Sequence, residues 1–390
     1  MESLIQKLKT SLPDGLKVRN PRKGLVVVSQ ENPQAFWEDL MGSLENRLPA
    51  VLMNPLWPAE WMDSLIKIAS GNSIDEKNMI LIPTSGSTGI PKFCIHSTDT
   101  LISAAEGFRE RFGKRGIIHS VNVLPQHHIG GLMPVFRSAA CDGKVHFADY
   151  RDAGSIGSAE FPLQEACISL VPTQLRRMCE SPDMRAILVR FGLILIGGAA
   201  CPSNLLDQCR HLGLQLAPCY GSTETAAMVS ALSPEDFLKD SNCVGTALPH
   251  ADIHLSKKGL ISVITNSVLH GYLPAKKNFS RSPFPTGDIG WRDSSGNLHI
   301  SGRADRMIIS GGENVHPEAL ENAAMASGMV LSARCVGLPD PDWGTRVELW
   351  VQPINDSPDV SEALTDILKK TLPPYARPKH IHLVTDQEEI

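Results

Sequence analysis

The sequence lacks the features that mark three special classes of protein. No apolar run approaches the roughly 20 residues of a membrane-spanning helix, so no membrane insertion is expected. Basic residues are not in excess, with 37 Lys and Arg against 42 Asp and Glu, which argues against a nucleic-acid partner. The nine cysteines include no C-x-x-C pair, which is typical of reduced thiols. Charges interrupt the first 20 residues, where a secretion signal would be apolar, and the cytoplasm is the expected location.

The composition is that of a globular protein with a substantial core. The chain has 390 residues, of which 42% are hydrophobic and 20% charged, enough for two or three domains. Apolar segments at 25–28 and 50–53 alternate with amphipathic helical segments at 34–44 and 59–69. This alternation of strand and helix predicts an α/β layer at the start of the chain.

A loop rich in glycine and hydroxyl groups follows a short apolar run at 79–82. It reads Thr84-Ser85-Gly86-Ser87-Thr88-Gly89-Ile90-Pro91-Lys92. Glycines let consecutive backbone N–H groups face an anion, hydroxyls add donors, and Lys92 adds positive charge, so the loop suits a polyphosphate. The spacing is not that of a Walker A loop, because Pro91 precedes the lysine and Phe93 follows it. A Ser/Gly-rich surface turn is the plainer alternative.

Three later segments each follow a predicted strand and combine glycine with polar or aromatic side chains. They are His127–Leu132 after the strand at 117–124, Gly197–Pro202 after 193–196, and Tyr220–Thr225 after 214–218. Taken singly, each has a plainer interpretation as a hydrogen-bonded histidine pair, a turn or a capped helix start. Their order behind the first loop favours one shared site.

The composition then changes toward Gly, Pro and short strands between 244 and 300. Asp288 lies between two predicted hairpins and could accept both hydroxyls of a ribose, with Arg303 as its cationic counterpart. Residues 306–384 predict a small α+β unit, with helices at 317–326 and 361–372 and strands at 330–337 and 346–353. Taken singly, Asp288 could be an ordinary loop carboxylate and Arg303 an ordinary surface guanidinium.

Six ordered stretches between Ile80 and about Val384 resemble the adenylate-forming enzymes, which include acyl- and aryl-CoA synthetases, carrier-loading adenylation domains and luciferases. The resemblance implies an α/β fold. Its large N-terminal domain, expected at 1–304, would hold stacked α/β sheets and a β-rich subdomain. A small, mobile α+β C-terminal domain, expected at 305–390, would follow a hinge.

The resemblance also implies a role for each matching residue. Catalytic contacts are expected from Thr84, Lys92, His128, Thr223 and Glu224. Glu224 would also bind Mg²⁺, whose preferred ligands are oxygens. Nucleotide binding is expected from Ser85, Gly86, Ser87, Thr88, Gly89, Gly198, Ala199, Tyr220, Gly221, Ser222, Asp288 and Arg303, with Tyr220 stacked on adenine. Asp305 would be the hinge, and Gly311 and Gly312 would line the thiol channel.

The implied reaction joins a carboxylic acid to coenzyme A at the expense of ATP, with Mg²⁺ as cofactor. The segments 227–236 and 244–249 are most similar to the o-succinylbenzoyl-CoA synthetases of menaquinone and phylloquinone synthesis, which predicts an aromatic carboxylic acid as the small-molecule partner. Another aryl- or acyl-CoA ligase remains an alternative, and the oligomeric state is open, a homodimer included.

One element of the family pattern is missing from the sequence. The family's adenylation lysine lies in a Gly-Lys pair that is expected beyond the Leu372–Lys379 segment, and no Gly-Lys follows Tyr375. We expect the C-terminal domain to be truncated. The alternative is a nucleotide-binding homologue without adenylation activity.

Overall fold

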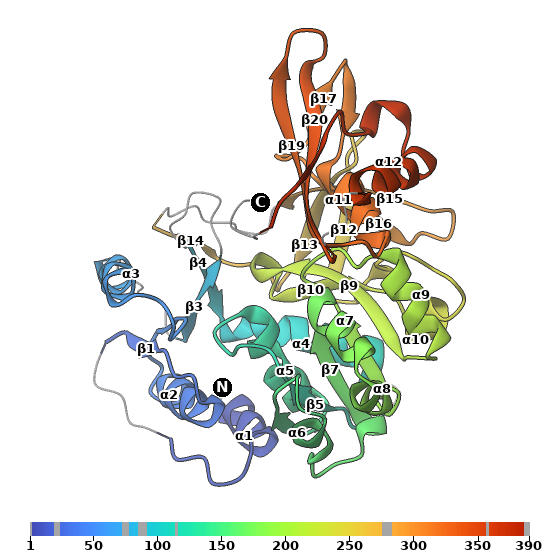
Figure 1. The fold of residues 1–390 in the computed structure, drawn as a ribbon. Helices are drawn as coiled ribbons and strands as arrows, with labels where there is room; N and C mark the ends of the chain where they lie inside the picture. The colour runs from blue at the N-terminus through green and yellow to red at the C-terminus, as the bar shows by residue number, and fades with distance from the viewer. Residues whose placement is uncertain are drawn as a thin grey trace.

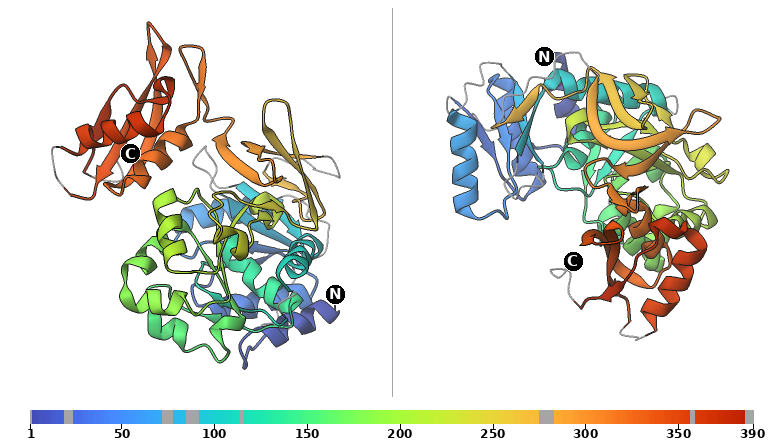
Figure 2. Two further views of the ribbon diagram at one scale, coloured as in Figure 1. Left: turned by 90° about the vertical axis from the view of Figure 1, so that its right-hand side faces the viewer. Right: turned by 90° about the horizontal axis from the view of Figure 1, so that it is seen from above.

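The computed structural model describes residues 2–18, 24–71, 78–84, 92–113, 116–274, 283–355 and 359–385. They form a mixed α/β structure in which a large N-terminal part carries a smaller C-terminal lobe, drawn in orange and red in Figure 1. Two further views show this lobe standing beside the larger part, to which the chain after β16 connects it (Figure 2). Across the described ranges, no helix combines the length and apolarity needed to cross a membrane.

The first sheet has the strand order β1-β2-β3-β4-β14. Its strands are β1 (Val26–Val28), β2 (Ala50–Leu52), β3 (Met79–Thr84), β4 (Lys92–Ser97) and β14 (Gly271–Leu273). The helices of this first part of the chain are α1 (Glu2–Ser11), α2 (Pro33–Glu45) and α3 (Ala59–Gly71). The strand–helix alternation predicted here is confirmed. Because β3 and β4 pair antiparallel, with Thr84 opposite Lys92, the predicted phosphate loop connects the two strands of a hairpin.

The second sheet carries most of the candidate site and has the order β11-β10-β9-β8-β7-β5-β6. Its strands are β5 (His119–Asn122), β6 (Val145–Phe147), β7 (Ala166–Leu170), β8 (Leu193–Ile196), β9 (Leu216–Ser222), β10 (Ala227–Ala231) and β11 (Thr246–Ala247). Strands β9, β8, β7, β5 and β6 run parallel, so the segments that follow them emerge at one edge. Ligands of open α/β sheets bind at such an edge.

Helices cover this second sheet and supply its apolar core. They are α4 (Thr98–Phe112), α5 (Ile129–Ala140), α6 (Ala153–Gly157), α7 (Pro172–Glu180), α8 (Pro182–Leu188), α9 (Ser203–His211) and α10 (Pro234–Phe237), with the short 3₁₀ turns η2 (Leu163–Glu165) and η3 (Thr223–Thr225). Ser97 caps α4 by accepting a hydrogen bond from the Thr100 N–H, and Asp99 lies in the first turn, where it suits the helix dipole.

Two further structures complete the chain. A four-stranded antiparallel sheet contains β12 (Ala251–Leu255), β13 (Leu260–Thr265), β15 (Phe284–Arg292) and β16 (Leu298–Arg303). The C-terminal lobe contains β17 (Ile308–Ser310), β18 (Glu313–Val315), α11 (Pro317–Ala326), β19 (Val330–Asp340), β20 (Gly344–Pro353), α12 (Val360–Thr371), η4 (Pro374–Ala376) and β21 (Ile381–Leu383). This lobe has its own apolar core between its sheet and α11 and α12. The predicted boundary at 304/305 stays a prediction.

His250 gives the N-terminal part a measurable pH dependence. Its ring lies where a side chain on Gly107 would otherwise stand, and neither ring nitrogen has a partner among the described residues. Burial lowers the pKa of this imidazole to about 4, below its ordinary 6.5. The folded protein therefore binds fewer protons than the unfolded chain, so stability is full above pH 6.5 and is lost as the pH falls toward 4.

We expect His250→Leu to leave stability at pH 7 little changed, since no described hydrogen bond is lost. Lowering the pH from 7 to 5 should raise the stability of the variant relative to that of the wild type by about 2 kcal/mol. The reason is that at pH 5 the His250 ring takes up a proton in the unfolded wild type but not in the folded one, which favours unfolding. Urea unfolding at both pH values measures this difference. An unchanged pH dependence would contradict the assignment of His250 as a buried neutral group.

Candidate active site

A cleft of about 680 Å³ opens at the carboxyl edge of the parallel strands. This volume is within the range of small-molecule sites. Its lining includes seven of the residues predicted for the site, namely Thr84, His128, Gly198, Gly221, Ser222, Thr223 and Glu224. The structure therefore brings together predicted residues from four separate segments of the chain. Ser85, Gly86, Ser87, Thr88 and Gly89 lie outside the described residues, and their predicted roles stay predictions.

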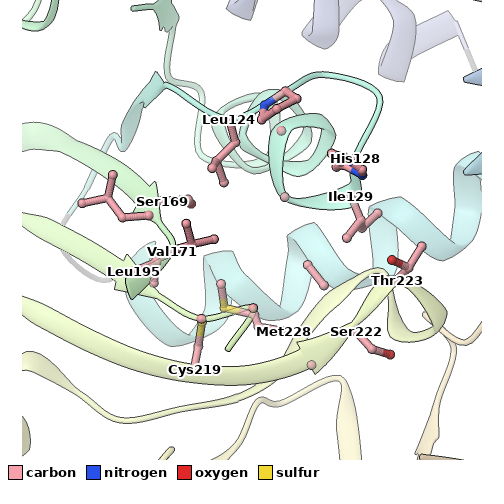
Figure 3. A pocket seen from close by; sticks show the side chains of 18 of the residues that line it. Leu124, His128, Ile129, Ser169, Val171, Leu195, Cys219, Ser222, Thr223 and Met228 are labelled. Atoms are coloured by element: carbon pink, nitrogen blue, oxygen red, sulfur yellow. The ribbon is translucent and has the colours of Figure 1, made fainter. Parts of the chain in front are cut away.

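The cleft has an apolar wall and a polar wall. Figure 3 shows Leu124, Val171, Leu195 and Met228 around the space, with the Thr223 hydroxyl on the side of the 3₁₀ turn η3. Leu124 follows β5, Val171 follows β7 and Leu195 lies on β8, so three of the four apolar side chains come from neighbouring strands, and Met228 on β10 adds the fourth. Such a surface suits a flat hydrocarbon, while the polar wall suits phosphate.

The turn η3 places Thr223 and Glu224 between two antiparallel strands. Ala226 and Ala227, just after the turn, have left-handed backbone angles (φ 53° and 77°), which L residues adopt at a cost. Three backbone carbonyls of the turn are hydrogen-bonded: those of Thr223, Glu224 and Thr225 accept from the His96 ring, the Leu269 N–H and the Ser267 hydroxyl. These bonds hold the turn in a conformation that it would not adopt alone.

His96 is a functional neighbour that the sequence analysis missed. Its buried ring lies between the Thr223 carbonyl oxygen (2.7 Å) and the Thr100 hydroxyl (2.9 Å). Because burial lowers its pKa to about 4, the ring is neutral at pH 7. A carbonyl can only accept, so Nε2 carries the proton and Nδ1 accepts from Thr100. The sequence held one signal for this role: His96 is the single polar residue in the otherwise apolar run 93–96.

A second polar cluster connects Tyr220 with the β-rich part of the chain. The Tyr220 hydroxyl donates to Asp288 Oδ2 (2.5 Å), and Arg303 Nη1 lies 3.5 Å from Asp288 Oδ1. Asp288 and Arg303 are opposite each other on β15 and β16, which accounts for their proximity. Burial, and then the Asp288 charge, raise the pKa of Tyr220, so the phenol keeps its proton. The predicted nucleotide residues Tyr220, Asp288 and Arg303 therefore form one group, joined by a hydrogen bond and an ion pair.

The guanidinium of Arg303 also pairs with Asp305, the predicted hinge residue. Two parallel hydrogen bonds join them, at 3.0 Å from Nε and 2.8 Å from Nη2. This pairing lowers the pKa of Asp305 and raises that of Arg303. Asp305 lies in the turn after β16, at the start of the C-terminal lobe. Its role as a hinge stays a prediction.

Arg137 is the second residue that the sequence analysis missed. It lies on α5, is 5% exposed, and lines the cleft. Its Nη1 donates to the Ser169 hydroxyl (3.2 Å), and its guanidinium lies over the Phe108 ring. Among the described residues no carboxylate forms an ion pair with it, and the titratable groups nearest to it are the thiols of Cys141, Cys167 and Cys219, which burial keeps protonated. Burial lowers its pKa, but a guanidinium remains charged.

A buried cation without a carboxylate is costly, so it indicates an anionic ligand. The sequence held one signal for Arg137. It is the single charged residue in the apolar helical run 129–140, where a helix that only packed against a core would not need one.

His128 marks the end of the cleft at which α5 begins. It is the N-cap residue of that helix, and its ring is exposed to the cleft. The walls still displace enough water to lower the pKa of the imidazole, so the ring is neutral at pH 7. The neighbouring His127 is buried against it, and burial lowers its pKa to about 4. The helix after His128 was not predicted from the sequence.

The remaining predicted residues lie outside the lining of the cleft. Lys92 is exposed at the start of β4, where its carbonyl accepts a hydrogen bond from the Thr84 hydroxyl (3.3 Å). Ala199 is exposed in the loop after β8. Gly311 and Gly312 lie in the C-terminal lobe with positive φ values of 57° and 84°. A side chain on Gly311 would collide with the Trp343 ring, so contact with this indole is one reason for glycine there.

The residues of the cleft fit a magnesium nucleotide. Glu224 offers one carboxylate beside the Thr223 hydroxyl, and the described residues contain no cluster of three His, Cys, Asp or Glu side chains able to cage a metal. Mg²⁺ is usually bound through one or two carboxylates together with substrate phosphates, so a single glutamate suits it.

Comparisons with known proteins agree with this geometry. The 2-succinylbenzoate–CoA ligase of Bacillus licheniformis is 31% identical over 320 residues, which are 77% of this chain and 65% of that protein. The ligase of the same name from Listeria monocytogenes is 29% identical over 311 residues, 77% of this chain and 65% of the relative. The matched region thus spans about two thirds of the length of these relatives.

A solved structure gives the same fold. The o-succinylbenzoate CoA synthetase MenE of Bacillus subtilis, in complex with the acyl-adenylate intermediate OSB-AMP, superimposes with a TM-score of 0.80 at 21% identity, covering 99% of this chain and 88% of that one. The predicted fold, a large N-terminal α/β part with a small C-terminal lobe, is confirmed. Residues 319–389 match the AMP-binding enzyme C-terminal domain. Residues 16–273 match the AMP-binding enzyme family, and the chain belongs to that family.

Proposed function

We propose that this chain is an ATP-dependent acid–CoA ligase that converts o-succinylbenzoate to its CoA thioester through an acyl-adenylate. The observation that carries the proposal is Arg137, a buried guanidinium without a described carboxylate partner, in the same cleft as Thr223 and Glu224. o-Succinylbenzoate has two carboxylates: one would be activated at the phosphate end, and Arg137 would bind the other. The apolar wall would pack against the aromatic ring.

The nucleotide would be bound by the polar group around β9. The Tyr220 ring would stack on adenine, Asp288 would accept from the ribose hydroxyls, and Arg303 would support the ribose and phosphates. In the structure Arg303 pairs with Asp305. To contact the nucleotide, its guanidinium must either bind both groups or release Asp305. Thr84 and Lys92 would flank the phosphates from the β3–β4 hairpin.

In the first half-reaction, a carboxylate oxygen of the acid attacks the α-phosphorus of ATP. The bond from this phosphorus to the bridging oxygen breaks, and pyrophosphate leaves with the electron pair. Magnesium, when bound at Glu224, supplies charge neutralisation between the anionic reactants. Thr223 would donate to the α-phosphate oxygens, and the neutral ring of His128 would orient the acid without adding charge.

In the second half-reaction, the sulfur of coenzyme A attacks the acyl carbon of the adenylate. The carbon–oxygen bond to the phosphate breaks, AMP leaves, and the thiol proton is lost to solvent. The turn of the C-terminal lobe that contains Gly311 and Gly312 would approach the cleft for this step, after rotation at Asp305.

The two half-reactions can be tested separately on the full chain. For the first half-reaction, the assay measures the pyrophosphate released when the protein is mixed with ATP, Mg²⁺ and o-succinylbenzoate. For the second half-reaction, the assay measures the thioester formed from chemically prepared o-succinylbenzoyl-adenylate and coenzyme A. We expect thioester formation in the second assay, at a rate that depends on Arg137.

The outcomes distinguish the proposed function from its alternatives. Thioester formation from another aryl-adenylate but not from o-succinylbenzoyl-adenylate would overturn the substrate and retain the ligase. Binding of ATP without pyrophosphate release or thioester formation would instead identify a nucleotide-binding homologue without ligase activity.

A further inference from the structure

The strand β14 places a phenol beside the carboxylate predicted to bind magnesium. The Tyr272 hydroxyl donates to Glu224 Oε1 at 3.0 Å. The hydrogen bond uses one carboxylate oxygen and leaves Oε2 of Glu224 available to a cation.

The position of Tyr272 is determined by both its strand and its packing. β14 pairs antiparallel with β4, and Tyr272 lies opposite Cys94. Its ring packs against a buried apolar cluster that contains Cys94, Leu269 and Phe284. A ring locked in this way can hold its hydroxyl in place without losing further side-chain entropy when a ligand binds.

The segment that ends in Tyr272 also holds the backbone of the turn η3. The Leu269 N–H donates to the Glu224 carbonyl oxygen (2.8 Å), and the Ser267 hydroxyl donates to the Thr225 carbonyl oxygen (3.0 Å). The same short segment therefore fixes both the backbone and the side chain of Glu224. Contact through the backbone alone would orient the turn but leave the carboxylate free to rotate.

We propose that Tyr272 is a positioning residue for magnesium binding, which orients the Glu224 carboxylate so that Oε2 faces the metal of the bound nucleotide. The inference rests on the proposed function, since it assumes that Glu224 is the metal ligand. Hydrogen-bond partners of ligating carboxylates typically contribute 10- to 100-fold to metal affinity or activity. Tyr272 would act through Glu224 and would not touch the substrate.

The test compares the binding of α,β-methylene-ATP in excess Mg²⁺ and in EDTA, by calorimetry on the full chain. The ratio of the two affinities is the magnesium enhancement. We expect Tyr272→Phe, which keeps the ring, to reduce this enhancement by about tenfold while leaving the affinity in EDTA unchanged. Tyr272→Leu, a second variant without the hydroxyl, should give the same ratio, and thermal unfolding without ligand checks that each variant is folded.

Two controls separate this inference from the proposed function. Tyr150→Phe removes a phenol that interacts with Arg177 outside the cleft and should leave both affinities unchanged. Glu224→Gln should remove the enhancement altogether. If Glu224→Gln keeps the enhancement, or the wild type shows none, Glu224 is not the metal ligand and the inference is overturned together with that part of the proposed function.

A different result would overturn the inference alone. If Glu224→Gln abolishes the enhancement but both Tyr272 variants retain it, Tyr272 does not position the carboxylate. An equal loss of affinity with and without magnesium would show that Tyr272 only supports the local fold.

Discussion

Replacing Arg137 by Met is expected to lower kcat/KM for o-succinylbenzoyl-adenylate about 100-fold in thioester formation. The physical reason is that a substrate carboxylate would lose the one cationic side chain described in the lining of the cleft, and a hydrogen bond to a charged group contributes up to about 3 kcal/mol. The wild type should prefer this substrate to the adenylate of 4-oxo-4-phenylbutanoate, which lacks the ring carboxylate. In the variant that preference should nearly disappear.

The stability of the same variant should not fall. Arg137 is buried without a described carboxylate, so removing its charge relieves a desolvation cost that the Ser169 hydrogen bond and the Phe108 contact only partly offset. Function lost with stability retained or increased is the pattern expected of a binding residue. Arg137→Lys should give intermediate kinetics, because an ammonium keeps the charge and loses the two-pronged geometry.

Arg210→Met is the matched control. This arginine also lies over a phenylalanine, Phe237, but it is paired with Asp207 on α9, away from the cleft. Its replacement should reduce stability and leave the preference between the two adenylates unchanged. If Arg137→Met retained the wild-type preference, Arg137 would not bind the second carboxylate, and the choice of substrate would lose its main support.

Gly221→Ala is expected to cost about 3 kcal/mol of stability and to abolish nucleotide binding. A Cβ at this position would overlap the carbonyl oxygen of Ala227 on the paired strand β10. Overpacking of this kind typically costs 1–3 kcal/mol, and relief requires backbone movement. The backbone that must move is the left-handed turn Ala226–Ala227, which holds Glu224 in the cleft.

Gly157→Ala provides the comparison, because a Cβ there would make only ordinary contact, 3.5 Å from Ile187. It should be neutral or slightly stabilising, since alanine is the better helix residue. Urea unfolding gives the two stabilities, and calorimetry with ATP and Mg²⁺ gives the binding. Wild-type affinity in a folded Gly221→Ala protein would show that the close approach of the two strands is not needed for the site.

Much of the fold could be predicted because its elements carry local signals. The apolar run 193–196 forms β8 with those bounds, and the helix predicted at 317–326 is α11. Errors appeared where tertiary pairing decides the structure. The strand expected at 214–218 continues to Ser222 as β9, because β10 returns alongside it, and β4 was not predicted because its pairing with β3 and β14 is not visible in a local pattern.

The candidate site divides in a similar way. Thr223, Glu224 and Asp288 belong to recognisable motifs. The structure places Thr223 and Glu224 in the lining of the cleft, and Asp288 accepts a hydrogen bond from Tyr220, which precedes the lining residue Gly221. Arg137, His96 and Tyr272 belong to none. Each acts through a residue distant in the sequence: Arg137 through Ser169, His96 through Thr223 and Tyr272 through Glu224. Contacts between distant segments arise from the packing of whole sheets, so the motifs alone could not indicate them.

The most direct test of the account is calorimetric binding of a non-hydrolysable o-succinylbenzoyl-adenylate analogue to the full chain. If one cleft binds both the nucleotide and the dicarboxylic acid, the joined ligand should bind at least about 100-fold more tightly than AMP, because its second part gains contacts without a second loss of translational freedom. Arg137→Met should remove most of that gain. Binding no tighter than that of AMP would contradict the central claim, because it would mean that the apolar wall and Arg137 do not receive the acid.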